Sequence, residues 1–211
     1  NMELFYGEYA GHETDVVLTT RELTRMIRSA HIDPASLVDR ECDPLMKEWT
    51  GAGVIFGTTG GVMEAALRSA HYLVTGRNPD PDAFKIVRNP GGQPGVVEAE
   101  IQLGDATVRA AVVSGLGNTR KLIEAIEHGE VHYDFVEVMA CRRGCMAGGG
   151  QPVPIGARTK AARYEGLYRI DDASQIKRSN DNPIVGELYE GLLKGKEHKL
   201  LHNNSDLPQA K

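Results

Sequence analysis

The stretch Glu137-Val-Met-Ala-Cys-Arg-Arg-Gly-Cys-Met-Ala-Gly-Gly-Gly-Gln-Pro152 follows an apolar run that begins at Tyr133. The run predicts a strand that ends directly at Cys141, the kind of position at which α/β proteins place their ligands. Cys145 lies four residues further on, and thiolates at this spacing can bind one metal cluster from a single short loop. The glycines that follow let the backbone approach a bound group closely. Because many cysteine pairs are simply buried small hydrophobic residues, the spacing alone leaves a structural role open.

Alternating strand and helix patterns surround this loop. Residues 96–103 and 106–114 are rich in apolar and β-branched residues, and the Gly104-Asp105 pair between them predicts a hairpin. Helices are predicted from the glycine turn Thr58-Thr-Gly-Gly61 through Thr75 and over residues 119–128. We therefore expect an α/β fold with a mixed or parallel sheet flanked by helices.

Shorter elements are predicted from local patterns. Residues 15–20 have the β-branched run of a buried strand, after which Thr19 or Thr20 caps a helix with Leu23 on its apolar face. Residues 51–57 predict a turn that packs close to a ligand or another backbone, and residues 84–87 predict a strand.

The helix that opens at Gly61 carries Glu64, for which the sequence favours a surface position. A glycine turn that enters a helix can also bind phosphate. No lysine of the P-loop type follows this turn, and no acidic residue stands at the dinucleotide-binding distance, so we do not expect a nucleotide site.

From about Thr159 the chain becomes helical and charged, which divides it into an α/β lobe, residues 1–158, and a helical tail, residues 159–211. Helices are expected at residues 160–170, 173–178 and 182–193, the last with Pro183 in its first turn. We expect the last of these helices to present an apolar face that needs a partner, formed by Leu188, Tyr189, Leu192 and Leu193.

Composition sets limits on the function. The 211 residues carry a net charge of −5 and no basic stripe, which argues against nucleic-acid binding. No apolar run approaches the roughly 18 residues of a membrane span. Three cysteines form no disulfide framework, which favours a reducing compartment, and we expect a cytoplasmic protein. Cys42 stands alone, and we expect it to be structural rather than a ligand.

The stretch from Glu137 to Pro152 resembles the third cysteine signature of the iron-only ([FeFe]) hydrogenases, Glu-x-Met-x-Cys-x-x-Gly-Cys-x-x-Gly-Gly-Gly-x-Pro, and matches every fixed position. Other stretches are also similar to family segments: residues 17–23, 54–68, 114–118, 163–170 and 198–202. The resemblance covers nearly the whole chain. It identifies the chain as the C-terminal half of the catalytic domain, followed by a tail like the family's small subunit.

The resemblance implies a site as well as a fold. In the family a [4Fe-4S] cubane is bridged to a di-iron subcluster, and the enzyme catalyses the reversible reaction of 2H+ and 2e− to H2. Cys141 would be a cubane ligand and Cys145 the bridging ligand. Met139 and Phe56 would line the di-iron pocket, and the glycine-rich backbone beside it is formed by Gly148, Gly149 and Gly150.

The first two cysteine signatures of the family, Thr-Ser-Cys-Cys-Pro and Met-Pro-Cys-x-x-Lys, do not occur in this sequence. We therefore expect the remaining ligands to come from an N-terminal half, and electrons to come from ferredoxin or an NAD(P)-linked subunit. We expect the isolated chain to be inactive and to self-associate through its uncovered apolar faces. Two alternatives are an iron–sulfur scaffold such as a cytosolic assembly factor, and a degenerate non-enzymatic remnant.

Two details depart from the family. Arg142 and Arg143 stand where many members have Pro-Gly or small residues. We expect them to face solvent and meet an acidic partner lobe; the alternative is that they raise the potential of the cluster or lower the pKa of the thiolates. Near the end, the usual Leu-Leu-His-Thr-His-Tyr is replaced by Leu-Leu-His-Asn-Asn-Ser. This change weakens any functional assignment to His202, which we expect to be a surface residue.

Overall fold

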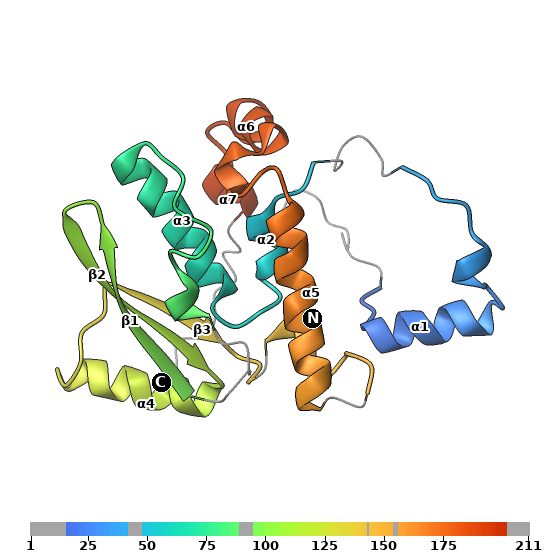
Figure 1. Ribbon diagram of the computed structural model, residues 1–211, viewed down its shortest axis with the longest axis horizontal. Coiled ribbons are helices and arrows are strands. Elements are labelled where there is room, and N and C mark those ends of the chain that lie inside the picture. Colours follow the sequence, from blue (N-terminus) through green and yellow to red (C-terminus); the bar gives the residue numbers. More distant parts are fainter. Residues whose placement is uncertain (1–15, 42–47, 89–94, 143, 154–155, 202–211) are drawn as a thin grey trace.

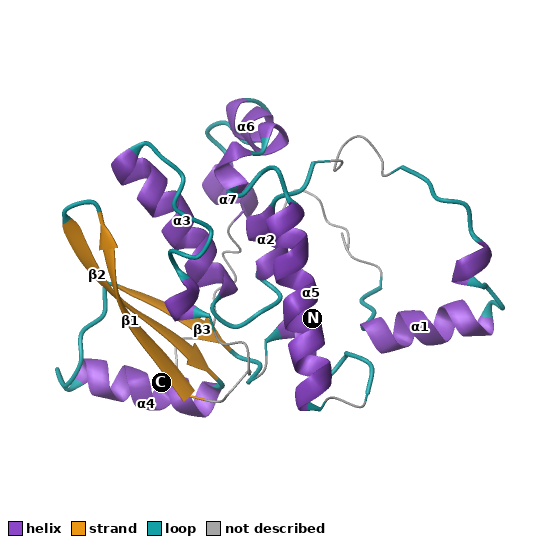
Figure 2. Ribbon diagram, in the orientation of Figure 1, coloured by secondary structure: helices purple, strands orange, loops and turns teal. Residues whose placement is uncertain are grey.

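The computed structural model describes residues 16–41, 48–88, 95–142, 144–153 and 156–201. The predictions for Cys42, Arg143 and His202 lie outside these residues. Figure 1 shows a sheet on one side of the molecule, a bundle of helices beside it, and helix α1 (Thr20–Ser29) at the far edge. Figure 2 shows the same arrangement by element type. Within the described residues, no helix combines the length and apolar character needed to cross a membrane.

The sheet contains three strands in the order β1-β2-β3. Strands β1 (Gly95–Leu103) and β2 (Ala106–Ser114) form the predicted antiparallel hairpin, in which Gly104 takes a positive φ of 60°. Helix α4 (Leu116–Glu127) then leads to β3 (Phe135–Met139), which pairs with β2 in parallel. The mixed sheet expected from the sequence is confirmed.

Alternating side chains of β2 pack against helices on the two faces of the sheet. Ala110 and Val112 join a core with residues of α3 (Gly61–Thr75), whereas Ala111 and Val113 pack with Leu122 of α4. Central strand β2 is therefore buried on both faces over its second half, as a continuous apolar run predicts.

Helices beside the sheet form a second packing unit. Helix α2 (Gly51–Ile55) packs against α5 (Ala157–Ala173) through a cluster of Ala52, Ile55, Ala65 and Tyr168. The tail continues through α6 (Pro183–Glu190), which begins with the predicted Pro183 after the Asn182 cap, and α7 (Glu197–Leu201). Short 3-10 turns complete the described elements: η1 (Pro34–Ser36), η3 (Lys85–Val87), η4 (Cys145–Ala147) and η5 (Ser179–Asp181).

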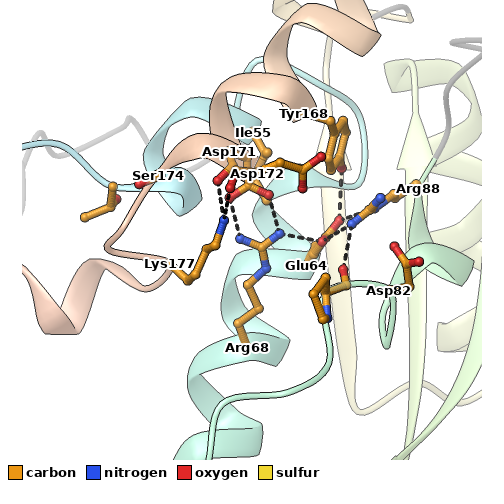
Figure 3. A network of polar contacts seen from close by, with 12 residues as sticks. Ile55, Glu64, Arg68, Asp82, Arg88, Tyr168, Asp171, Asp172, Ser174 and Lys177 are labelled. Atoms are coloured by element: carbon orange, nitrogen blue, oxygen red, sulfur yellow. Dashed lines mark hydrogen bonds and ion pairs between the residues drawn. The ribbon is translucent and has the colours of Figure 1, made fainter.

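A buried ionic network joins α3 to α5, and it contradicts the surface position predicted for Glu64. Figure 3 shows Arg68 bound to Asp171 through two hydrogen bonds of 2.8 and 2.6 Å and to Glu64 at 2.7 Å. Arg88 binds the same Glu64 carboxylate at 2.7 and 2.6 Å, and the Tyr168 hydroxyl donates to it at 3.0 Å. Two carboxylates thus balance two guanidinium groups, which makes burial of Glu64 to 1% exposure possible.

The network also sets the ionisation of its members. Desolvation opposes the charge of Arg68, but hydrogen bonds to Asp171 and the charge of Glu64 outweigh it and raise the Arg68 pKa. Burial and the nearby charge of Glu64 raise the pKa of Tyr168, which keeps its hydroxyl protonated as a donor.

Predictions for three N-terminal and central segments were wrong in element type. Residues 16–19 are not in a strand and lead into α1, whose predicted Thr19 cap is confirmed by a capping box with Glu22. Residues 51–55 are helical because Thr50 accepts a hydrogen bond from the Gly53 N–H. Residues 85–87 form η3, since buried Phe84 and Val87 are three positions apart, the spacing of a 3-10 turn.

The helix expected at residues 173–178 does not form. Helix α5 ends with Ser174 as its C-cap, and the Ser174 hydroxyl donates to the carbonyl of Ile176. The Lys177 ammonium donates back to the carbonyls of Asp171 and Asp172, so it satisfies the end of α5. The chain turns here instead of continuing as a helix.

We predict that Arg68→Met destabilises the chain by about 3–5 kcal/mol, because it leaves the buried Asp171 without its cation. Lys85→Met is the matched control, since Lys85 pairs with Asp82 at 2.6 Å while both side chains are more than half exposed. The control should cost at most about 1 kcal/mol. Urea unfolding monitored by circular dichroism measures both, and equal effects would contradict the role given to the network.

Candidate metal centre

The cysteine loop begins where the sheet ends. Strand β3 stops at Met139, whose carbonyl accepts a hydrogen bond of 2.8 Å from the N–H of Gly115. The Ser114 hydroxyl donates to the carbonyl of Arg142 at 2.8 Å. The end of β2 therefore fixes both the last residue of β3 and the residue just after Cys141.

Gly144 allows the loop to turn between its two cysteines. Its φ of 69° and ψ of 175° lie in a region that is open essentially to glycine alone, and its N–H donates to the Cys141 carbonyl at 3.1 Å. A Cβ on Gly144 would lie 3.0 Å from the backbone nitrogen of Thr59. One residue after Cys145, the Met146 N–H donates to the Gly57 carbonyl at 2.9 Å. The loop is thus packed directly on the turn that precedes α3.

Both predicted metal ligands face the outside of the described structure. Cys141 and Cys145 are exposed free thiols, whereas Met146 and Ala147 behind them are each 5% exposed. Phe56 is 44% exposed and adjoins Gly57, which holds the loop, and Met139 is half-buried two residues before Cys141. The fold brings the four side chains to one end of the lobe. Their roles as ligands and pocket lining stay predictions.

The three consecutive glycines contribute mainly through their backbone. The Gly148 N–H donates to the Cys145 carbonyl at 3.2 Å, and the carbonyls of Gly149 and Gly150 accept from the Arg21 side chain and backbone N–H at 2.5 and 3.1 Å. A Cβ on Gly150 would lie 2.7 Å from the Cβ of Thr19, so a side chain here would push α1 away. Gly149 has no atom within 4 Å of such a Cβ.

Two arginines that sequence reasoning did not single out hold this loop from outside. Arg21 of α1 binds it as described above, and Arg163 of α5 donates to the carbonyls of Met146 and Pro152 at 2.9 Å each. Their acceptors are backbone carbonyls, which every residue type provides. The signal in the sequence was that both arginines lie in stretches similar to family segments, Arg21 in residues 17–23 and Arg163 in residues 163–170.

Glu137 connects the cysteine loop to α3 from within the core. Its carboxylate accepts hydrogen bonds from the N–H groups of Gly60 at 2.8 Å and Met63 at 2.7 Å. Gly60 has a φ of 90°, and a Cβ there would lie 2.1 Å from the Val87 carbonyl oxygen, so the helix cannot be capped by its own N-cap side chain. Burial raises the pKa of Glu137, and the two backbone hydrogen bonds oppose this rise.

The residues present fit an iron–sulfur cluster, though only as part of its ligand set. Within the described residues, no group of three or more His, Cys, Asp and Glu side chains could hold a metal ion, so the loop offers two thiol donors. A [4Fe-4S] cluster takes four cysteine ligands. Beside the loop, the buried Thr59 hydroxyl has no hydrogen-bond partner in the described part of the chain, which leaves one donor available next to the thiols.

Comparison with protein families gives two consecutive matches. Residues 2–149 match the C-terminal domain of the iron-only hydrogenase large subunit, and residues 157–204 match the iron hydrogenase small subunit. The fold is therefore that of a hydrogenase catalytic lobe with a small-subunit-like tail. The chain belongs to the iron-only hydrogenase family, as its cysteine signature indicated.

Individual relatives agree with this assignment. The chain is 40% identical over 197 residues to the NADP-reducing hydrogenase subunit HndD of Solidesulfovibrio fructosivorans, which covers 91% of this chain and 33% of the relative. It is 47% identical over 162 residues to the periplasmic [Fe] hydrogenase large subunit of Nitratidesulfovibrio vulgaris. This match covers 74% of this chain and 38% of that subunit. An apo variant of the [FeFe]-hydrogenase HydA1 from Chlamydomonas reinhardtii superimposes with a TM-score of 0.68 at 36% identity. The superposition covers 90% of this chain and 54% of the HydA1 chain.

A non-hydrogenase relative is also similar, at lower identity. Cytosolic iron-sulfur assembly component 3 of Mus musculus is 30% identical over 213 residues, covering 95% of this chain and 43% of that protein. The chain thus spans about a third to two fifths of the length of the curated relatives it matches.

We predict that Gly144→Ala destabilises the chain by about 1–3 kcal/mol, because alanine is strained at this φ and ψ. Its Cβ would also press on Thr59. Gly149→Ala, in the same loop but without a nearby atom or a positive φ, should change stability by less than about 0.5 kcal/mol. Chemical unfolding of the two variants side by side tests this difference. A Gly149→Ala effect as large as that of Gly144→Ala would count against the packing described.

We predict that Glu137→Gln costs about 1–3 kcal/mol, because the amide NH2 group cannot accept either buried N–H, whereas both carboxyl oxygens can accept in the protonated and the ionised form. The cost should depend on pH. Since burial raises the folded-state pKa of Glu137, the folded chain retains a proton that the unfolded chain releases first, and stability falls as pH rises through that window. The advantage of the natural chain over the variant should therefore be largest at acid pH and shrink toward neutrality. The measurement is the unfolding free energy of both proteins from acid to neutral pH. A stability difference that grows as pH rises would contradict the prediction.

Proposed function

We propose that this chain supplies part of the active site of an iron-only hydrogenase that catalyses the reversible reaction of protons and electrons to H2. The observation that carries the proposal is the loop with two exposed thiols, Cys141 and Cys145, which packs on the turn before α3 and is held by arginines from two helices. Exposed thiols on a loop that several hydrogen bonds hold in place suit a cofactor shared with another segment.

Each residue of the site has a proposed role. Cys141 would bind a [4Fe-4S] cubane, and Cys145 would bind it and bridge to the di-iron subcluster. When bound, this group supplies the proton-reducing chemistry. Half-buried Met139 and exposed Phe56 would then exclude water from one side of the pocket. The backbone of the three glycines would allow close approach, with Gly149 offering the least hindered position.

The partners follow from the same reasoning. The remaining cluster ligands would come from an N-terminal half of the catalytic domain, and the name of the NADP-reducing relative supports an NAD(P)-linked electron partner, with ferredoxin as the other candidate. Residues 1–158 would act as the lobe and residues 159–211 as the tail. This division agrees with the family matches, since the first ends at residue 149 and the second begins at residue 157. Tyr189 and Leu192 of the tail are exposed, which supports self-association of the isolated chain.

We propose a cytoplasmic location, although one relative is periplasmic.

An iron–sulfur scaffold remains the second candidate, because the assembly component is similar over most of the chain. Its 30% identity is below the 40% of the hydrogenase subunit. The two functions differ in one measurable respect, since a scaffold would bind a cluster without producing hydrogen.

We predict that anaerobic reconstitution with iron and sulfide loads a cluster that depends on the loop. Cys141→Ala and Cys145→Ala should lose most of the bound iron, because each removes one of two thiolates from the site. Cys42→Ala, a change of the third cysteine, is the matched control and should retain it. Iron and acid-labile sulfide analysis provides the measurement, and equal iron in all variants would exclude the loop as the site.

The activity is tested by supplying the other half. With a di-iron subcluster mimic, the chain alone should evolve no more hydrogen than Cys145→Ala. Addition of a hydrogenase fragment chosen because it contains Thr-Ser-Cys-Cys-Pro and Met-Pro-Cys-x-x-Lys should restore evolution to the natural chain but not to the variant. Cluster binding without hydrogen evolution in the combined protein would favour the scaffold, and evolution by the chain alone would contradict the need for a second half.

A further inference from the structure

Two adjacent threonines in the turn before α3 differ in one respect that the fold does not explain. Thr58 and Thr59 are both fully buried, at 0% and 1% exposure. The Thr58 hydroxyl donates to the Ile55 carbonyl at 2.9 Å. The Thr59 hydroxyl has no partner in the described part of the chain, although a buried hydroxyl without a hydrogen bond destabilises a folded protein. A function in the assembled site would explain why it is retained.

The position of Thr59 relates it to the cysteine loop. Its backbone nitrogen lies 3.0 Å from where a Cβ of Gly144 would stand, which places it against the residue between the two cysteines. The next residue, Gly60, is held by Glu137 at 2.8 Å, and Gly57 on the other side accepts from Met146 at 2.9 Å. Both ends of this turn are therefore tied to the segment that carries the thiols, which limits how far Thr59 can move from it.

We propose that the Thr59 hydroxyl donates a hydrogen bond to a sulfur atom of the bound iron–sulfur cluster, either a cysteine thiolate or a bridging sulfide. The inference rests on the proposed function, because it needs a cluster at Cys141 and Cys145. Anionic sulfur is a charge-assisted acceptor, and hydrogen bonds to cluster sulfur stabilise the reduced, more negative state. Thr59 is then a positioning residue that raises the reduction potential of the cluster and takes no part in the chemistry itself.

The proposal predicts effects of opposite sign in the two states of the protein. Thr59→Val keeps the shape of the side chain and removes the hydroxyl. In the cluster-free chain it should raise the urea midpoint, because the unpaired polar group is gone. In the cluster-loaded protein it should lower the reduction potential, so that the ratio of reduced to oxidised cluster at a fixed potential falls about fivefold. Thr59→Ser, which keeps the donor, should leave this ratio close to that of the natural chain.

Thr58→Val is the matched control, since its hydroxyl already has a partner. It should lower the urea midpoint of the cluster-free chain and leave the reduction potential unchanged. The measurements are urea unfolding of the 211-residue chain and a redox titration, followed by electron paramagnetic resonance, of the chain reconstituted with iron and sulfide beside a hydrogenase fragment that contains the first two cysteine signatures.

The outcomes separate the two proposals. A natural chain that binds no cluster overturns both the proposed function and this inference. A cluster that binds but keeps its potential in Thr59→Val overturns the inference alone, and so does an equal shift in Thr58→Val. A lower potential in Thr59→Val that is restored by serine supports the hydrogen bond to sulfur.

Discussion

The carboxylate of Glu137 is the contact on which the geometry of the site depends. It belongs to β3, yet it satisfies the first N–H groups of α3, which Gly60 leaves without a side-chain cap. The positive end of the helix helps to offset the cost of burying this charge. Because Glu137 joins the strand that leads into the cysteine loop to the start of α3, it fixes the position of the turn before α3 relative to that loop. Gly144 can then pack against Thr59.

The ionic network around Glu64 and Arg68 extends this arrangement to the tail. Asp171 of α5 completes the charge balance of α3, and Arg163 of the same helix holds the cysteine loop by two carbonyls. The tail is thus attached to the lobe by a buried charge pair and to the site by a pair of hydrogen bonds. A region that matches a small subunit therefore helps to hold the cysteine loop in place.

The sequence predicted those parts of the fold that depend on local patterns. The hairpin at Gly104, the helix after Gly61 and the strand before Cys141 follow from turn chemistry and periodicity, and the cysteine signature identified the family. Glu64 was misplaced because its partner Arg88 is 24 residues away and Arg68 binds Asp171 across 103 residues, pairings that no local pattern shows. Residues 84–87 were misassigned because a short apolar run suits a strand and a buried 3-10 turn equally well.

The two helices that flank the cysteine loop hold it through its main-chain carbonyls. Arg21 and Arg163 bind the oxygens of Gly149, Met146 and Pro152, and these acceptors persist whatever side chains the loop carries. Changes of side-chain identity in the loop would therefore leave these contacts intact, because the arginines that make them belong to α1 and α5. A substitution of Gln151 would leave these carbonyl contacts in place, whereas loss of Arg21 or Arg163 would release the loop from one of the two helices.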